Sequence, residues 1–294
     1  AGSLFNEISN NSIKKNSYGI WLSFSSNNFI INNDVSSNEN SALNILSGSQ
    51  NNIIKTNNIS KNDIGVTASV GNINEINYIE NNTISYNNYG VEANFNNIVR
   101  DNRINGNGFG IRVPFDNVTI TGNKILENGV GVYVQSAGNT RKGNNITLNE
   151  IKSSTVGILL ESPNHTIRLN DLRGNTISLK NNIQNPTHNI TAEENYWGTT
   201  NRDEIEAVIY HCIDDETVGC VDFEPWLDKP FGVILIGDVT GDCKVDIFDL
   251  AAVGKAFGSS SGDPNWNPAA DINKDGIINI IDLAAVGKAF GNIC

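Results

Sequence analysis

The chain has 294 residues and a formal net charge of −12, from 32 acidic and 20 basic side chains. This length suits two domains with room for a sizeable core. The acidic balance argues against a nucleic-acid or anionic-membrane partner, and no apolar run approaches the ~18 residues of a membrane-spanning helix.

The four cysteines form two local couples. Cys212 and Cys220 enclose a short loop, and Cys243 and Cys294 bracket the last segment of the chain. An even, locally paired set favours an oxidising compartment, so we expect an extracellular or cell-surface protein. The chain opens in the middle of a repeating pattern, and we interpret it as the C-terminal part of a longer secreted protein.

Residues 1–200 repeat a phrase of asparagine, isoleucine and glycine, Asn-x-Ile-x-x-Asn-x-Ile-x-x-Asn-x-x-Gly-Ile. Its Gly-Ile end, or an equivalent, recurs at steps of 19 to 26 residues. The recurrences begin at Gly19, Ala42, Gly65, Gly90, Gly110, Gly131, Gly157 and Thr176. Short β-branched pieces with this period predict a mainly β fold, a right-handed single-stranded parallel β-helix of about eight coils. Asparagine suits its corners, because it tolerates left-handed backbone and can hydrogen-bond from coil to coil.

This region, residues 1–228, resembles the right-handed β-helix repeat proteins, including the group often labelled periplasmic copper-binding. The runs at residues 195–199 (Asn-Tyr-Trp-Gly-Thr) and 223–227 (Phe-Glu-Pro-Trp-Leu) are similar to the end of that group. Between them, residues 203–210 predict a short helix with acids in its first turn. We expect this helix to cap the open end of the β-helix, fixed by Trp197, Trp226 and a Cys212–Cys220 disulfide.

Relatives of this group include pectate lyases, polysaccharide hydrolases and uronate epimerases, which bind sugars along one strand face. The first predicted outward column of that face is Trp21, Asn44, Thr67, Glu92, Arg112, Tyr133, Leu159 and Ser178. The second is Ser23, Leu46, Ser69, Asn94, Pro114, Gln135, Glu161 and Lys180. Glu92, Arg112 and Tyr133 therefore fall on three adjacent coils.

This cluster allows three interpretations. It can be a solvated face with a Glu92–Arg112 ion pair, a carbohydrate-binding face, or a lyase or epimerase site in which Tyr133 and Arg112 act on an α-proton. A hydrolase is disfavoured, because Glu92 and Glu161 lie three coils apart.

Copper binding is a further possibility that the resemblance raises. The chain has no methionine and three histidines. His165 and His188 each precede an inward isoleucine by two residues and are expected to stack on successive coils. The alternatives are a two-histidine metal site and histidine in place of asparagine in a corner column that includes Asn28, Asn52 and Asn77.

Residues 229–236 form an apolar junction that is unsuited to a free linker, and we expect it to pack on the cap.

Residues 237–294 contain the same sequence motif twice, at a constant offset of 33 residues. Each copy places oxygen donors at positions 1, 3, 5, 9 and 12 of a loop, with a backbone carbonyl at position 7, which is the spacing of an EF-hand calcium loop. The predicted ligands are Asp238, Thr240, Asp242, Lys244, Asp246 and Asp249 in loop one, and Asp271, Asn273, Asp275, Ile277, Asn279 and Asp282 in loop two.

Each loop leads into the helical run Leu-Ala-Ala-Val-Gly-Lys-Ala-Phe-Gly, in which Leu250, Val253, Ala256 and Phe257 form one apolar face. Val245 and Ile278, at position 8, are expected where the two loops pair back to back. The segment resembles the dockerin family, a small all-α module. That resemblance implies two Ca²⁺ ions, calcium-dependent folding and docking to a cohesin module of another protein. Dockerins often select the cohesin with small hydroxyl residues at positions 10 and 11, whereas this chain has Ile247-Phe248 and Ile280-Ile281.

Loop position 6 normally needs glycine, because its backbone has positive φ. Gly276 satisfies this rule and Cys243 does not. Two alternatives follow: a Cys243–Cys294 disulfide that clasps the module, or a weakened first calcium site beside a free thiol.

Together these observations predict a secreted β-helix protein that a dockerin anchors to a cohesin-bearing partner, with the β-helix as a rigid display or carbohydrate-contacting arm. The alternatives are a polysaccharide lyase or epimerase acting on uronate-containing glycans, and a purely structural surface-layer component.

Overall fold

The computed structural model of the chain describes residues 4–46, 48–69, 76–135, 143–232, 235–242 and 244–292. The chain divides into two compact units, residues 1–228 and residues 229–294. Among the described residues, no helix has the length and apolar character needed to cross a membrane.

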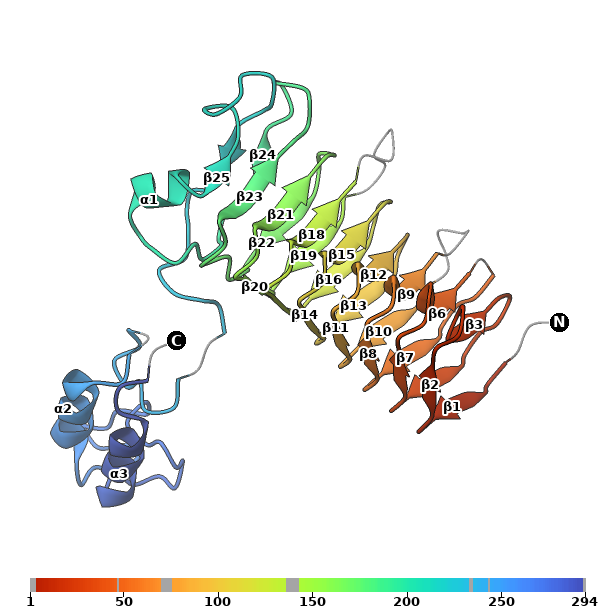
Figure 1. The fold of residues 1–294 in the computed structure, drawn as a ribbon. Coiled ribbons are helices and arrows are strands. Elements are labelled where there is room, and N and C mark those ends of the chain that lie inside the picture. The colour runs from red at the N-terminus through yellow and green to blue at the C-terminus, as the bar shows by residue number, and fades with distance from the viewer. Residues whose placement is uncertain are drawn as a thin grey trace. The chain divides into compact units, whose positions relative to one another are not determined.

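The first unit is a parallel β-helix in which each coil contributes one strand to each of three sheets (Figure 1). Sheet one contains β1 (Glu7–Ser9), β4 (Phe29–Ile31), β7 (Ile53–Lys55), β10 (Tyr78–Glu80), β13 (Ile98–Arg100), β16 (Thr119–Thr121), β19 (Asn145–Thr147) and β22 (Thr166–Arg168). Sheet two contains β2 (Ser12–Lys14), β5 (Asp34–Ser36), β8 (Asn58–Ser60), β11 (Thr83–Ser85), β14 (Arg103–Asn105), β17 (Lys124–Leu126) and β20 (Glu150–Lys152). Sheet three contains β3 (Ile20–Leu22), β6 (Ser41–Ile45), β9 (Ile64–Ala68), β12 (Tyr89–Ala93), β15 (Phe109–Val113), β18 (Val130–Val134), β21 (Val156–Leu160), β23 (Ile177–Asn181) and β25 (Ile209–Tyr210). The predicted fold class is confirmed.

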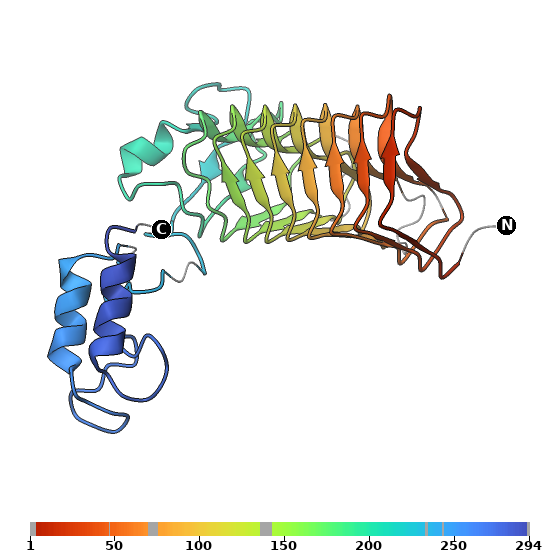
Figure 2. The same cartoon turned by 60° about the horizontal axis from the view of Figure 1, so that its bottom comes forward.

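The core is a set of aliphatic columns that run along the stack. The middle residue of each short strand points inward, so Ile54 pairs with Ile79 and Ile79 with Val99, all fully buried. Burying each such side chain contributes roughly 1.5–3 kcal/mol relative to leaving it exposed. Figure 2 shows the strands of successive coils in line, which is the arrangement that superimposes these side chains.

Asparagine ladders follow the three corners of each coil. Asn57 is typical: its Oδ1 accepts from the backbone N and Nδ2 of Asn33 at 2.9 and 3.0 Å, and its Nδ2 donates to Oδ1 of Asn82 at 3.0 Å. The first ladder contains Asn6, Asn28, Asn52, Asn77 and Asn97, and, beyond Val118, Asn144 and His165. The second contains Asn11, Asn33, Asn57, Asn82, Asn102, Asn123, Asn149, Asn170 and Asn195. The third contains Asn16, Asn38, Asn62, Asn87, Asn107, Asn128, Ser154 and Asn175.

The ladder residues are not the left-handed ones. Positive φ falls on the residue just before a ladder position, and it is adopted there by Lys61 (59°), Tyr86 (57°) and Glu127 (57°) as well as by asparagine. The ladder asparagine at each corner is therefore required for its amide hydrogen bonds, as predicted. The left-handed backbone that asparagine tolerates occurs at the position before it, where Asn27, Asn51 and Asn81 adopt it. The glycine of the Gly-Ile signature has a steric role, since a Cβ on Gly90 would lie 2.5 Å from the carbonyl oxygen of Gly110 in the next coil.

The last full coil has a different register from the predicted one. Leu159 pairs with Lys180, and Ser178 is buried, so Lys180 continues the first outward column and Ser178 does not. Matching Thr176-Ile177 to the Gly-Ile signature was therefore wrong by two residues. The backbone oxygen of Ser178 consequently lies next to Gly157, where a Cβ on Gly157 would be 2.5 Å from it.

The cap differs from the single helix expected over residues 203–210. Helix α1 (Arg202–Glu206) starts after the N-cap Asn201 and buries Ile205, and the chain then returns to sheet three as β25. A further pair, β24 (Ile190–Thr191) and β26 (Val221–Asp222), extends the stack. The predicted Cys212–Cys220 disulfide is present, and Trp197 is buried against Phe223.

The second unit contains two helices of equal length, α2 (Ile247–Ala256) and α3 (Ile280–Ala289). Val253, Val286, Val245 and Ile278 are buried in its core. Phe257 follows the end of α2 and is 52% exposed, so its assignment to the apolar face was wrong. The backbone of Val245 bonds to Gly291 and Asn292, and that of Ile278 to Gly258 and Ser259. Each position-8 residue thus pairs with the segment that follows the other helix. Two equivalent sets of backbone hydrogen bonds take the place of the expected pairing between the loops.

Candidate calcium site and the outward face of sheet three

Asp249 organises the first loop from the start of α2. Its Oδ1 accepts from the backbone N of Val239 and Thr240 at 2.8 and 2.9 Å, and its Oδ2 accepts from the backbone N of Asp246 at 2.8 Å. The carboxylate is fully buried. Burial opposes its ionisation, but these hydrogen bonds outweigh burial and hold the pKa of Asp249 below its ordinary value.

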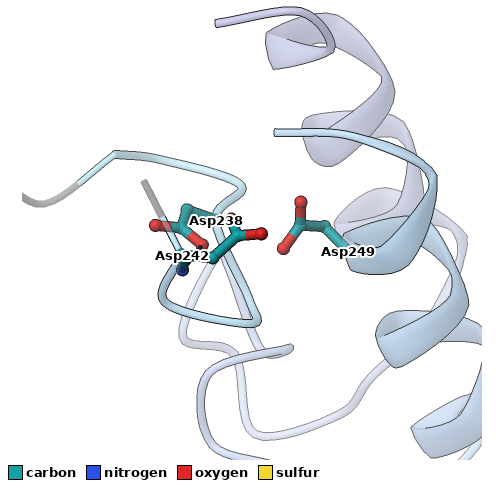
Figure 3. A group of neighbouring side chains, drawn as sticks. All are labelled: Asp238, Asp242 and Asp249. Carbon is teal, nitrogen blue, oxygen red and sulfur yellow. Dashed lines mark hydrogen bonds between the residues drawn. The ribbon is translucent and has the colours of Figure 1, made fainter. Parts of the chain in front are cut away.

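Asp238 and Asp242 face Asp249 from the loop (Figure 3). One carboxylate oxygen from each of the three lies within 4.8 Å of the others. Oδ1 of Asp238 also accepts from the backbone N of Gly241 and Asp242 at 2.6 and 3.1 Å, which folds the loop around that oxygen. Calcium binds oxygen at about 2.3–2.6 Å, so oxygens of one coordination sphere can lie up to about 5 Å apart. The residues present therefore fit a hard divalent cation, which would neutralise three carboxylates in close proximity.

The second loop repeats the arrangement with fewer charges. Oδ1 of Asp282 accepts from the backbone N of Ile272 and Asn273 at 2.8 and 3.2 Å, and Oδ2 of Asp271 accepts from the backbone N of Gly276 at 3.0 Å. Asp275 pairs with the side-chain amide of Asn273 at 2.8 Å. Within the described part of the chain, the close three-carboxylate group occurs in loop one alone.

The remaining predicted ligands lie on the same loops. Asp246 and Asn279, at position 9, are also the N-caps of α2 and α3 and accept from Phe248 N and Ile281 N, each at 2.8 Å. Thr240 Oγ1 donates to Asp249 Oδ1 at 3.0 Å. Lys244 and Ile277 are each expected to contribute a carbonyl at position 7. The ligand assignments therefore stay predictions that the loop geometry supports.

Both helices begin with exposed apolar side chains. Ile247 and Phe248 are 61% and 66% exposed, and Ile280 and Ile281 are 64% and 56% exposed. The predicted partners Cys243 and Cys294 lie outside the described residues, so their disulfide stays a prediction. The backbone bond from Val245 N to Asn292 O, at 2.9 Å, joins the segments that carry them.

Residues 236–291 match the family described as dockerin type I domain. The chain is a dockerin fused to a parallel β-helix. Residues 2–97 match the right handed beta helix region family, and residues 68–210 match the family described as periplasmic copper-binding protein (NosD). Neither the curated proteins nor the solved structures contain a match to the chain. Dockerin type I domains bind calcium and a dockerin binds a cohesin, so this is a cohesin-binding β-helix protein, and both families suggest an extracellular or envelope location.

On the β-helix, the structure brings Glu92 and Arg112 together on the outward face of sheet three. Arg112 Nη1 bonds to Glu92 Oε2 at 2.9 Å, and its Nε and Nη2 both donate to Gln135 Oε1, at 3.0 and 2.8 Å. The guanidinium also lies over the Tyr89 ring, 5.2 Å from its centroid. The polar atoms of this cluster are thus directed at one another.

Tyr133 pairs with Glu161 and is linked to the Glu92–Arg112 group through Gln135. Its hydroxyl donates to Glu161 Oε2 at 2.8 Å. Burial and this hydrogen bond raise the pKa of Tyr133 to about 12, so the phenol is protonated at neutral pH. A general base needs a pKa near the working pH, and this arrangement does not favour Tyr133 in that role.

The two histidines proposed to stack have different environments. His165 continues the first ladder: its Nδ1 accepts from Asn144 N at 3.0 Å, and its Nε2 lies 3.1 Å from Ser162 Oγ. His188 is exposed and follows a turn closed by its backbone N to Asn185 O. His165 therefore acts as a ladder residue, which is the second of the two alternatives given above.

Because His165 accepts through Nδ1, its protonation would break the ladder. Burial lowers its pKa, against a smaller opposing effect of Ser162 and Asp116. The pKa of a histidine in an unfolded chain is about 6.5. As the pH falls, the unfolded chain therefore binds more protons than the folded chain does. The contribution of His165 to the free energy of unfolding is lost progressively below about pH 6.5. We expect His165→Asn, which keeps an acceptor and cannot titrate, to lose less stability between pH 7 and 5 than the natural chain. Urea unfolding midpoints at each pH measure the difference, and parallel profiles would contradict it.

Proposed function

We propose that this protein attaches through its calcium-loaded dockerin to a cohesin module on another extracellular or cell-surface protein, and that its β-helix is a rigid arm. The observation that carries the proposal is the donor set of loop one, in which three carboxylates converge at the start of α2. The repeated loop at the start of α3 would hold a second calcium ion. The ladders and aliphatic columns provide the stiffness of the arm.

The contact with the cohesin would be apolar. Ile247, Phe248, Ile280 and Ile281 occupy corresponding positions at the starts of the two helices, and all are more than half exposed. Large apolar side chains at the centre of an interface typically provide most of its binding energy. A cohesin surface that receives them would therefore lack charge at its centre.

Calorimetric titration with a panel of cohesins tests the proposal. We expect binding in calcium, no binding in chelator, and at least a ~30-fold loss for Phe248→Asp combined with Ile281→Asp, since burial of each new carboxylate costs several kcal/mol. Tyr86→Asp is the matched control, because Tyr86 is 63% exposed on the β-helix. Calcium-independent binding, or an equal loss in the control, would contradict the proposal.

Carbohydrate contact is a second candidate role for the arm. Tyr89 and Phe109 stack at 5.1 Å between ring centroids, and Trp21 is half exposed on the same sheet. Aromatic faces of this kind suit sugar rings. A glycan array probed with the natural chain and with Trp21→Ala tests it, and equal signals for the two would remove Trp21 from this role.

A further inference from the structure

Helices α2 and α3 each contain a glycine that the packing of the dockerin does not explain. Gly254 and Gly287 lie inside the helices, seven residues after Ile247 and Ile280, and both are exposed. A Cβ on either glycine would have no atom of another part of the chain within 4 Å. Every other glycine of residues 229–294 has positive φ, which accounts for its presence, whereas these two do not.

These two glycines weaken the helices that contain them. Inside a helix glycine is among the least favourable residues and alanine is the most favourable, because glycine loses more backbone freedom on folding. Alanine would fit at both positions, since its methyl group would meet open space. The dockerin by itself would therefore gain stability from alanine, and its own fold offers no reason for glycine.

Both glycines lie on the exposed helix face that begins at the apolar residues proposed to contact the cohesin. Residues seven apart lie on one side of a helix, about 10 Å from each other along its axis. Gly254 therefore shares a face of α2 with Ile247, and the exposed Ala251 lies between them. Helix α3 has the same order of exposed residues 33 positions later. Side chains on this face decrease in size along the helix and leave its backbone uncovered at the glycine.

We propose that Gly254 and Gly287 are specificity-determining residues at which a protruding apolar side chain of the cohesin packs directly on the helix backbone. The inference rests on the proposed function and extends the contact beyond the starts of the helices. Without a Cβ, glycine lets a partner atom approach the backbone more closely than any other residue does. The Cα of Gly254 and the methyl group of Ala251 provide an apolar surface, which Ile247 bounds at one end and the exposed Lys255 at the other.

Gly254→Ala combined with Gly287→Ala in the full chain tests this. In calcium we expect the melting transition of the dockerin to rise by at least ~4 °C, because alanine favours the helix, and calcium affinity to stay unchanged. The affinity for a cohesin that binds the natural chain should fall at least ~10-fold, because a methyl group added to a closely packed contact forces the partner away. A purely structural role of the glycines would not move stability and affinity in opposite directions.

Two further variants define the cause of the loss. Gly254→Leu combined with Gly287→Leu retains a high helix propensity and adds more bulk, so we expect a larger loss of cohesin affinity than with alanine. Ser12→Thr is the control, because it adds one methyl group to an exposed strand residue of the β-helix. Its affinity for the cohesin should equal that of the natural chain.

The outcomes separate this inference from the proposed function. A higher melting temperature together with weaker cohesin binding supports it. Unchanged or tighter binding by the alanine or leucine variant would overturn it and leave the proposed function in place. An alanine variant that melts below the natural chain would also overturn it, because the fold would then require glycine. A natural chain that binds no cohesin in calcium would remove the proposed function and this inference together.

Discussion

Chelation of calcium is expected to unfold the dockerin and to leave the β-helix folded. The carboxylates of Asp238, Asp242 and Asp249 converge within 4.8 Å, and without a cation their repulsion opposes the closed loop. An ion that binds only the folded state stabilises it by about 4 kcal/mol at a thousandfold excess over Kd. Replacing Asp249 and Asp282 by alanine removes one ligand from each loop together with its backbone acceptors. We expect this variant to lose the calcium-dependent rise in the dockerin melting transition and at least ~100-fold in cohesin affinity.

Two further variants separate metal binding from helix capping. Asp249→Asn with Asp282→Asn keeps one acceptor oxygen for the backbone donors of each loop and removes both charges, so we expect folded but calcium-weakened loops. Asp263→Asn removes an acid that bonds to Ser260 outside the loops, and should leave calcium binding unchanged. Calorimetry with calcium and melting with chelator measure these effects. A melting curve that chelation does not move would show that the loops close without the ion.

Replacing Asn102 by alanine is expected to destabilise the β-helix by about 3–5 kcal/mol. Asn102 is 1% exposed. Its Oδ1 accepts from Asn82 N and Nδ2, and its Nδ2 donates to Asn123 Oδ1 and to the carbonyls of Ile79 and Arg100, all at 2.8–3.0 Å. Alanine leaves several of these buried groups without a partner, and a buried polar group without a partner costs about 1–3 kcal/mol.

Urea unfolding of the β-helix measures this loss. Asn88→Ala is the control, because Asn88 is exposed and its side chain bonds to Asp63 alone among the described residues, at 3.1 Å. We expect the control to stay within about 0.5 kcal/mol of the natural chain. Equal midpoints for Asn102→Ala and Asn88→Ala would mean that the ladder contributes little to stability.

Local sequence patterns were sufficient for the two architectures. The Asn-x-Ile phrase predicted the β-helix, because a strand alternates its side chains every residue and a repeated phrase superimposes them between coils. The two acidic loops predicted the dockerin, because alternate residues of a tight loop can all point inward. Cys212 and Cys220 were paired correctly because only eight positions separate them.

Contacts between distant residues needed the tertiary structure. Whether Tyr133 bonds to Arg112 or to Glu161 depends on how far each side chain reaches across neighbouring coils. The position of Lys180 in the outward column follows from the pairing of β21 with β23, which the weak signature at Thr176 could not provide. The backbone hydrogen bond between Val245 and Asn292 joins the beginning of the dockerin to its end, so the spacing within one loop could not predict it.

The sequence by itself determined the repeating coil, the paired acidic loops and the residue types that each requires, because these depend on spacing within about a dozen neighbouring positions. Only the tertiary structure decided which polar groups satisfy one another. Hydrogen-bond pairing depends on three-dimensional proximity and direction, and neither is encoded in the spacing of a single coil.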